Sequence, residues 1–223
     1  QRTECLGNLR QIMLAWQMHY SEHDDKLVPN FRPRNMTGSS TPPPWVQGDR
    51  HYAYDSVTNA DFLTDSRFAA FAGTIRNPRV YRCPAVRHKI QGVPLTRSFS
   101  LNQYMGAVSQ SETAPGYATF TRVHDVAPPM QMFTFLEMNP HTICTSMAYV
   151  PMDTNRPRGN FHLPSYLHDG RAAMAFADGH IELYRVRDKD TLRTYQVDWL
   201  RDHDFAVTNA DVQAIRAQTT YPK

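Results

Sequence analysis

Four side chains that can bind metal ions lie close together in the last third of the sequence: His162, His168, Asp178 and His180. A structural zinc site needs three or four such ligands in tetrahedral geometry. The sequence has neither closely spaced cysteine pairs nor the His-Glu-x-x-His pattern of zinc proteases. The alternative is that Asp178 shapes a turn and His168 hydrogen-bonds to backbone, and the pattern favours it, because Asx side chains stabilise such turns unaided.

The chain contains three cysteines, Cys5, Cys83 and Cys144. An oxidising compartment would allow one disulfide and leave one thiol, whereas buried unpaired thiols would act as small apolar residues. Cys144 lies near His141, but a cysteine nucleophile also needs a third, orienting group, and the spacing identifies none. Signatures of serine hydrolases, P-loops and dinucleotide sites are absent.

Aromatic residues gather in the predicted loops. The segment 31–50 holds six prolines and glycines and is interpreted as a long surface loop that ends near Trp45. Together with Tyr52 and Tyr54, Trp45 could form a loop surface that binds carbohydrate or protein. The more common role of such residues is to pin proline-rich loops onto the core.

The elements that would position these residues begin with an amphipathic helix predicted over 2–23. Its apolar stripe repeats every 3.6 residues and comprises Cys5, Leu6, Leu9, Ile12, Met13, Trp16 and Tyr20. No capping signal precedes this stripe, so we expect the helix to continue upstream in the natural protein. Leu14 and Met18 lie one turn apart on the opposite side, either as stray surface residues or as a contact for a partner helix.

Asp178-Gly179 separates two extended runs and predicts a two-residue type I′ hairpin over 171–186. In that register Phe176 pairs with Ile181 and Met174 with Leu183, which would give one continuous apolar face. Further strands are predicted at 80–83, 97–104 and 130–136. Short helices are predicted near 59–73, 191–202 and 210–217.

Composition limits the class of protein. The 223 residues are 41% hydrophobic and 20% charged, as in an ordinary globular protein. A net charge of +3 is too small for a dedicated nucleic-acid binder. No window of 18 uncharged apolar residues occurs, so nothing in these residues spans a membrane. We expect one domain, with a helix over 1–24, a head over 25–187 and a C-terminal extension over 188–223.

Three segments in this order resemble one bacterial family. They are residues 2–30, the middle section with Tyr-Arg-Cys-Pro-Ala at 81–85 and Arg-Ser-Phe-Ser-Leu-Asn-Gln-Tyr-Met-Gly at 97–106, and His168 separated by nine residues from Asp178-Gly179. The chain is similar to prepilin-like or pseudopilin-like proteins, of the type II secretion protein G kind, that carry a prepilin-type processing-associated H-X9-DG domain. The similarity covers most of the chain.

This resemblance implies an α+β, pilin-like fold: a long N-terminal helix packed on a small antiparallel sheet, with long proline-rich loops and a C-terminal tail carrying a short helix. It implies a precursor cut by a prepilin peptidase and anchored in the inner membrane of the cell envelope by an upstream helix, with the head periplasmic or extracellular. It also makes Cys5 and Cys83, which both lie in family-like segments, the preferred disulfide pair.

Related pilin-like proteins can hold calcium in a sheet loop, for which Asp153 or Asp188 and Asp190 would be the ligands here. No dense loop of oxygen ligands supports calcium, so no cofactor is expected.

The expected function is therefore structural and not enzymatic. The chain would be a pseudopilin-like subunit of a type II secretion or type IV pilus-like envelope system, partnered through its first helix by copies of itself or other pilin-like subunits, and not by nucleic acid. The alternative is an extracellular module whose loops 31–55 and 111–120 bind a polysaccharide or a secreted protein. A metal-dependent hydrolase built on the histidines ranks third.

Overall fold

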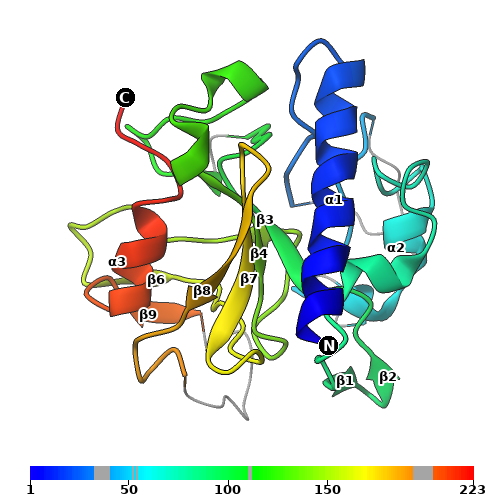
Figure 1. The fold of residues 1–223 in the computed structure, drawn as a ribbon. Helices are drawn as coiled ribbons and strands as arrows, with labels where there is room; N and C mark the ends of the chain where they lie inside the picture. Colours follow the sequence, from blue (N-terminus) through cyan, green and yellow to red (C-terminus); the bar gives the residue numbers. More distant parts are fainter. Residues whose placement is uncertain (33–40, 52, 54, 110–111, 193–202) are drawn as a thin grey trace.

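The computed structural model describes residues 1–32, 41–51, 53, 55–109, 112–192 and 203–223. A long helix, α1 (Arg2–Glu22), lies beside a five-stranded sheet (Figure 1). The strands of this sheet are β3 (Phe99–Asn102), β4 (Phe133–Glu137), β5 (Met147–Ala148), β7 (Arg171–Phe176) and β8 (Ile181–Arg185). Their spatial order is β5-β3-β4-β7-β8, and β5 runs parallel to β3 while the other neighbours are antiparallel.

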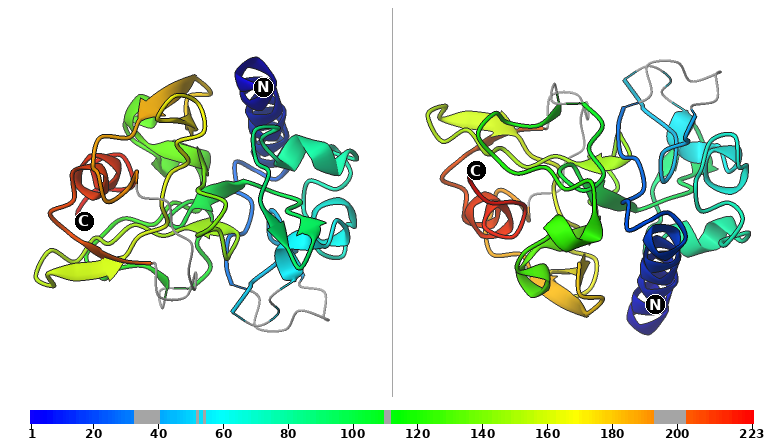
Figure 2. Two further views of the ribbon diagram at one scale, coloured as in Figure 1. Left: turned by 90° about the horizontal axis from the view of Figure 1, so that it is seen from below. Right: turned by 90° about the horizontal axis from the view of Figure 1, so that it is seen from above.

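Shorter elements surround this sheet. Two small two-stranded sheets are formed by β1 (Lys89–Ile90) with β2 (Val93–Pro94), and by β6 (Arg158–Asn160) with β9 (Asp204–Ala206). The remaining helices are α2 (Asp61–Thr64) and α3 (Ala210–Arg216), with 3-10 turns η1 (Ser56–Thr58), η2 (Pro78–Tyr81), η4 (Val123–Asp125) and η5 (Pro129–Gln131). Figure 2 shows α1 between the central sheet and the segment that carries α2 and η2.

The apolar stripe of α1 is buried as its spacing predicts. Cys5, Leu9, Ile12, Met13 and Trp16 are buried, and Leu6 and Tyr20 are partly buried against the same core. Met13 is tied to the middle of the sheet, because the hydroxyl of Thr134 on β4 donates to its Sδ at 3.1 Å. The prediction of an amphipathic helix is confirmed, and burial of this stripe fixes which side of α1 faces the sheet.

The central strands are buried on both sides. Every residue of β3 and β4 is buried, and β7 is buried from Ala172 onward. A strand covered on both faces needs a continuous apolar run instead of strict alternation, as the sequence of β4 (Phe-Thr-Phe-Leu-Glu) provides. Glu137 ends this run as a fully buried carboxylate.

The prediction of a strand at 80–83 is wrong, because residues 80 and 81 belong to the 3-10 turn η2. Pro78 provides a fixed φ at the start of that turn, and the side chain of Asn77 caps it by accepting from the N–H of Arg79. The helix predicted near 59–73 is shorter than expected, since only α2 is α-helical there. The strands predicted at 97–104 and 130–136 correspond to β3 and β4.

The predicted hairpin exists, but its predicted register is wrong by one residue. Ala175 pairs with Ile181 and Met174 with Glu182. The N–H of Gly179 donates to the carbonyl of Phe176, and the N–H of Phe176 donates to the carbonyl of His180. Since Gly179 has φ +95°, the connection is a turn followed by a left-handed glycine, which makes the loop one residue longer than a type I′ turn.

The C-terminal segment packs into the same domain as the rest of the chain. Its strand β9 pairs with β6, and α3 buries Val212 and Ile215 in the core. The side chain of Asn209 caps α3 by accepting from the N–H groups of Asp211 and Val212, so the predicted helix near 210–217 is confirmed. The helix predicted near 191–202 falls largely on residues 193–202, outside the described residues.

The expected pilin-like fold is wrong. The central sheet is mixed, because β5 adds parallel to β3, and two further sheets accompany it. The described residues include three α-helices, of which only α1 is long, among many short strands. The proline-rich segment 151–164 folds back onto the domain and supplies β6 and the buried ring of Phe161. One element of the expectation remains, a long first helix packed against a sheet.

Gly179 provides a test of this hairpin. Gly179→Ala is expected to lower the free energy of unfolding by about 1–2 kcal/mol, because an L side chain at φ +95° is strained. Urea unfolding monitored by circular dichroism measures the effect. Gly73→Ala is the control, since an added Cβ at Gly73 would meet no atom within 4 Å and should change stability by less than about 0.5 kcal/mol. Equal stabilities of the two variants would contradict the observed turn.

Candidate functional site

Four ionisable side chains from distant parts of the chain meet in one buried cluster, which we call the thiol–carboxylate cluster: Cys5, Cys83, Glu137 and His168. Cys5 belongs to the inner stripe of α1, Cys83 follows η2, Glu137 ends β4, and His168 precedes β7. None of the four residues is more than 5% exposed. Their metal-binding atoms all lie within 4.8 Å of one another.

Backbone contacts hold these side chains in place. The side-chain amide of Asn8 on α1 donates to the carbonyls of Arg79 and Arg82, which fixes α1 against η2. The N–H of Cys83 donates to the hydroxyl of Ser98 at 2.7 Å. The N–H of Ala173 on β7 donates to Oε2 of Glu137 at 3.0 Å. The cluster therefore lies where α1, the central sheet and the η2 segment join.

The cluster is connected by short polar contacts. Nε2 of His168 lies 3.3 Å from Sγ of Cys83 and 3.5 Å from Oε2 of Glu137. The hydrogen bond with Glu137 raises the pKa of His168, against the opposing effect of burial. Hydrogen bonding with Cys83, burial and the nearby Glu137 carboxylate together raise the pKa of the Cys5 thiol. These contacts therefore favour the protonated form of both the His168 ring and the Cys5 thiol.

A second group of side chains surrounds Cys144. Its Sγ lies 3.4 Å from Nε2 of His162, whose Nδ1 lies 2.8 Å from the carbonyl oxygen of Met147 and donates to it. The ring of His203 is 4.6 Å from that of His162, and its Nε2 donates to the carbonyl of Thr142 at 2.9 Å. Ligand atoms of His51, Cys144 and His203 lie within 4.8 Å of one another.

Burial keeps this second group uncharged. It raises the pKa of the Cys144 thiol to about 12, lowers the pKa of His203 to about 4, and lowers the pKa of His162 well below its usual value. A protonated thiol is a poor nucleophile, because the thiolate is the reactive form. Cys144 is also not paired with His141, the neighbour considered from the sequence, whose ring lies 4.3 Å from that of His88.

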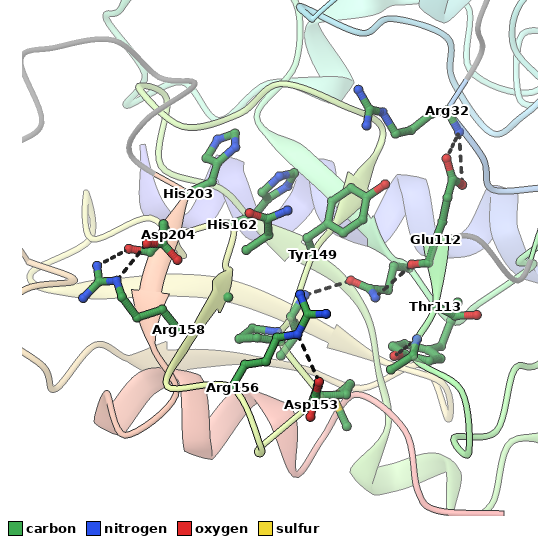
Figure 3. Close-up of a pocket in the computed structure, with 18 of the residues that line it drawn as sticks. Arg32, Glu112, Thr113, Tyr149, Asp153, Arg156, Arg158, His162, His203 and Asp204 are labelled. Atoms are coloured by element: carbon green, nitrogen blue, oxygen red, sulfur yellow. Dashed lines mark hydrogen bonds and ion pairs between the residues drawn. The ribbon is translucent and has the colours of Figure 1, made fainter.

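His51, His162 and His203 also border a pocket of about 1020 Å³ (Figure 3). Three arginines reach its wall, and each has an acidic partner. Arg32 pairs with Asp49 at 2.7 Å, Arg156 with Asp153 at 3.4 Å, and Arg158 with Asp204 at 2.8 Å. The pocket therefore offers many hydrogen-bonding groups but little net charge. Residues 112–115 and Tyr149 complete the side near Arg32.

The metal-capable residues singled out in the sequence do not form one site. His168 belongs to the thiol–carboxylate cluster, and His162 belongs to the group around Cys144. Asp178 and His180 remain at the hairpin tip, where Oδ1 of Asp178 accepts from the backbone N–H of His180 and lies 2.6 Å from its Nδ1. The turn holds Asp178 and His180 at the exposed tip of the hairpin, apart from the buried histidines.

The structure brings Cys5 and Cys83 together, but as free thiols and not as the expected disulfide. Leu14 and Met18 are 55% and 39% exposed on the outer face of α1. Trp45 is fully buried, with Nε1 donating to the carbonyl of Ser146, so the expectation that it forms a loop binding surface is wrong. Tyr52 and Tyr54 lie outside the described residues.

Sequence reasoning missed Glu137, His51 and His203. A carboxylate at the end of the apolar run Phe-Thr-Phe-Leu is a usable signal for Glu137, because buried charges require a partner. His51 and His203 carry no such signal, since they meet only through the tertiary fold.

Comparisons with known proteins leave the family open. No protein-family model matches the chain, and no curated protein and no solved structure matches it either. Within the described residues, no helix combines the length and the apolar character that crossing a membrane requires.

The buried histidines predict an acid-sensitive stability. The pKa of His203 falls from about 6.5 to about 4 on folding, so only the unfolded chain binds this proton between those values. The contribution of His203 to the free energy of unfolding is fully present above pH 6.5. This contribution falls by on the order of 2–3 kcal/mol as the pH drops toward 4. Denaturant unfolding across this range measures the slope.

His203→Gln should make that slope shallower. His124→Gln is the control, because His124 is exposed and its pairs with Asp25 and Asp125 are those of a solvated surface. If both variants kept the slope of the unmodified chain, His203 would not be the titrating group.

Proposed function

We propose that this chain is a structural subunit of a bacterial envelope assembly, with a pseudopilin-like role in a type II secretion or type IV pilus-like system. The single observation that carries the proposal is how the His168-x9-Asp178-Gly179 segment braces α1. The proposal concerns the role of the chain and does not depend on a pilin-like fold, which the mixed sheet excludes.

Both ends of this segment lie against α1. At its start, His168 contacts Cys83 in the cluster that includes Cys5 of α1. At its end, a Cβ on Gly179 would lie 2.8 Å from the side-chain amide nitrogen of Gln17. Cys5 and Gln17 are about 18 Å apart along the helix axis. The segment between them is β7, so one strand holds more than half of α1 in a fixed position.

The opposite face of α1 is available to a partner. Leu14 and Met18 lie one helical turn apart and are exposed, while the stripe behind them is buried. Apolar residues at this spacing form the ridges by which two helices pack. A firmly braced helix with an outward apolar pair suits a subunit that joins copies of itself, or related subunits, through this helix. In this role a precursor would be processed by a prepilin peptidase, with the head outside the inner membrane.

A second candidate function is binding of an extracellular ligand, and the pocket in Figure 3 favours it. Arg32 and the segment 112–115 line one side, and these lie in the two loops that the sequence indicated for binding. Ion pairs within the wall cancel most of the charge, and Tyr149 adds aromatic surface. Such a lining suits a neutral, hydroxyl-rich ligand such as an oligosaccharide.

Photocrosslinking tests the assembly role. A photoreactive amino acid at position 14 or 18, in the full-length natural protein in its own cells, should give adducts with a second copy or with a pilin-like subunit identified by mass spectrometry. The same amino acid at Val93, which is 48% exposed in the β1–β2 hairpin, is the control. Equal adducts at all three positions, or recovery of the uncrosslinked protein from the cytosol alone, would contradict the assembly role.

Titration calorimetry with a panel of soluble oligosaccharides tests the binding role. Tyr149→Ala and Arg158→Ala are each expected to weaken binding by about tenfold, which corresponds to about 1.4 kcal/mol. Arg67→Ala is the control, because Arg67 is exposed, pairs with Asp65 and does not line the pocket. Loss of affinity in the control as well, or no saturable binding by any sugar, would count against this function.

A further inference from the structure

The thiol–carboxylate cluster combines the chemical groups of a structural zinc site. We propose that Cys5, Cys83, Glu137 and His168 bind one zinc ion and thereby join α1 to the sheet. Thiolate, imidazole and carboxylate are all zinc ligands, and four protein ligands without an open position are typical of a structural site. This inference does not depend on the proposed assembly role.

The distances in the cluster fit a tetrahedral ion. With zinc–sulfur bonds of about 2.3 Å and zinc–nitrogen or zinc–oxygen bonds of about 2.0–2.1 Å, neighbouring ligand atoms lie about 3.3–3.8 Å apart. The separation of 3.3 Å from Cys83 Sγ to His168 Nε2 falls in this range, and the Glu137 carboxylate lies beside this pair, with its Oε2 at 3.5 Å from His168 Nε2. The largest separation within the cluster is no more than 4.8 Å, so binding needs only small side-chain shifts.

Glu137 supplies an independent argument. Its Oε2 accepts from the N–H of Ala173, but among the described residues its Oε1 has no hydrogen-bond partner, although Glu137 is fully buried. An unsatisfied buried oxygen of a carboxylate is costly. A bound cation would satisfy this oxygen, whereas the hydrogen bond from Ala173 already fixes the orientation of the carboxylate. That backbone contact is the kind of outer support that orients metal ligands.

Charge and proton balance make the site self-consistent. A Zn²⁺ ion held by two thiolates, one carboxylate and one neutral imidazole gives the site a net charge of −1. No bond to carbon forms or breaks, and no oxidant is needed. Because zinc binds cysteine as the thiolate and histidine as the neutral imidazole, binding displaces protons to solvent and is expected to be tighter at higher pH.

A disulfide between Cys5 and Cys83 is the competing state, because it uses the same two sulfur atoms. It would remove both thiolate ligands and leave only Glu137 and His168. The two states are mutually exclusive within one molecule. Without metal, the reduced chain is heavier than the disulfide form by two hydrogens and has two more reactive thiols.

Metal analysis of the intact chain, purified with its thiols reduced, is the first test. We expect one zinc per chain by plasma mass spectrometry and a lower melting temperature after chelation, restored by added Zn²⁺. Cobalt substitution should give the visible absorption of tetrahedral, thiolate-bound Co²⁺. Absence of zinc both as isolated and after titration of the reduced chain with ZnCl₂ would overturn the proposal, as would a native Cys5–Cys83 disulfide.

Variants then assign the ligands. Cys83→Ser, Glu137→Gln and His168→Ala should each weaken zinc affinity by at least roughly a hundredfold, in a competition assay with a chromogenic chelator. The matched control is Cys144→Ser, a buried cysteine of the other group, which should retain the zinc. Zinc lost with Cys144→Ser but kept with Cys83→Ser would transfer the site to that group and refute the assignment. Since Glu137→Gln preserves size, loss of zinc from this variant with a retained circular dichroism spectrum separates ligation from misfolding.

Discussion

Burial of one face of α1 is the constraint on which most of the described fold depends. The helix has an apolar stripe from Cys5 to Trp16, and this stripe needs cover along about 17 Å of its axis. No single neighbour provides that cover. The sheet contacts it through Thr134 and β7, and the η2 segment approaches from the other side, held by Asn8. The two halves of the molecule are therefore organised around a shared helix (Figures 1 and 2).

The junction of α1, the sheet and the η2 segment also contains a buried polar cluster. Glu137 and His168 are buried near the end of the helix where Cys5 and Cys83 meet, and ionisable side chains in such a place are expensive to desolvate. Apolar residues of similar volume would pack there at less cost. The retention of four ionisable groups at one junction is therefore better explained by something that they bind than by packing alone.

Local signals in the sequence predicted local structure well. The stripe of α1, the helix predicted near 210–217 and the turn at Asp178-Gly179 each depend on residues within one or two turns of one another. The predicted register of the hairpin is wrong. One left-handed glycine lengthens the loop by a residue, and this shift changes which side chains of β7 and β8 share a face. The mixed sheet was not predicted, because β5 has only two residues and pairs with a strand 46 positions earlier in the sequence. Glu137 and His203 acquired their importance only through long-range contacts of this kind.

The run of β7 alongside α1 has a mechanical consequence. Helix and strand point in the same direction, with Cys5 near the start of the strand and Gln17 near the turn that follows it. A pull along the axis of α1 therefore acts along β7 and not across it. Its ladder bonds to β4 and β8 would be loaded together in shear, instead of opening one after another from an end. The domain is thus built to transmit axial force from its first helix into the centre of its sheet.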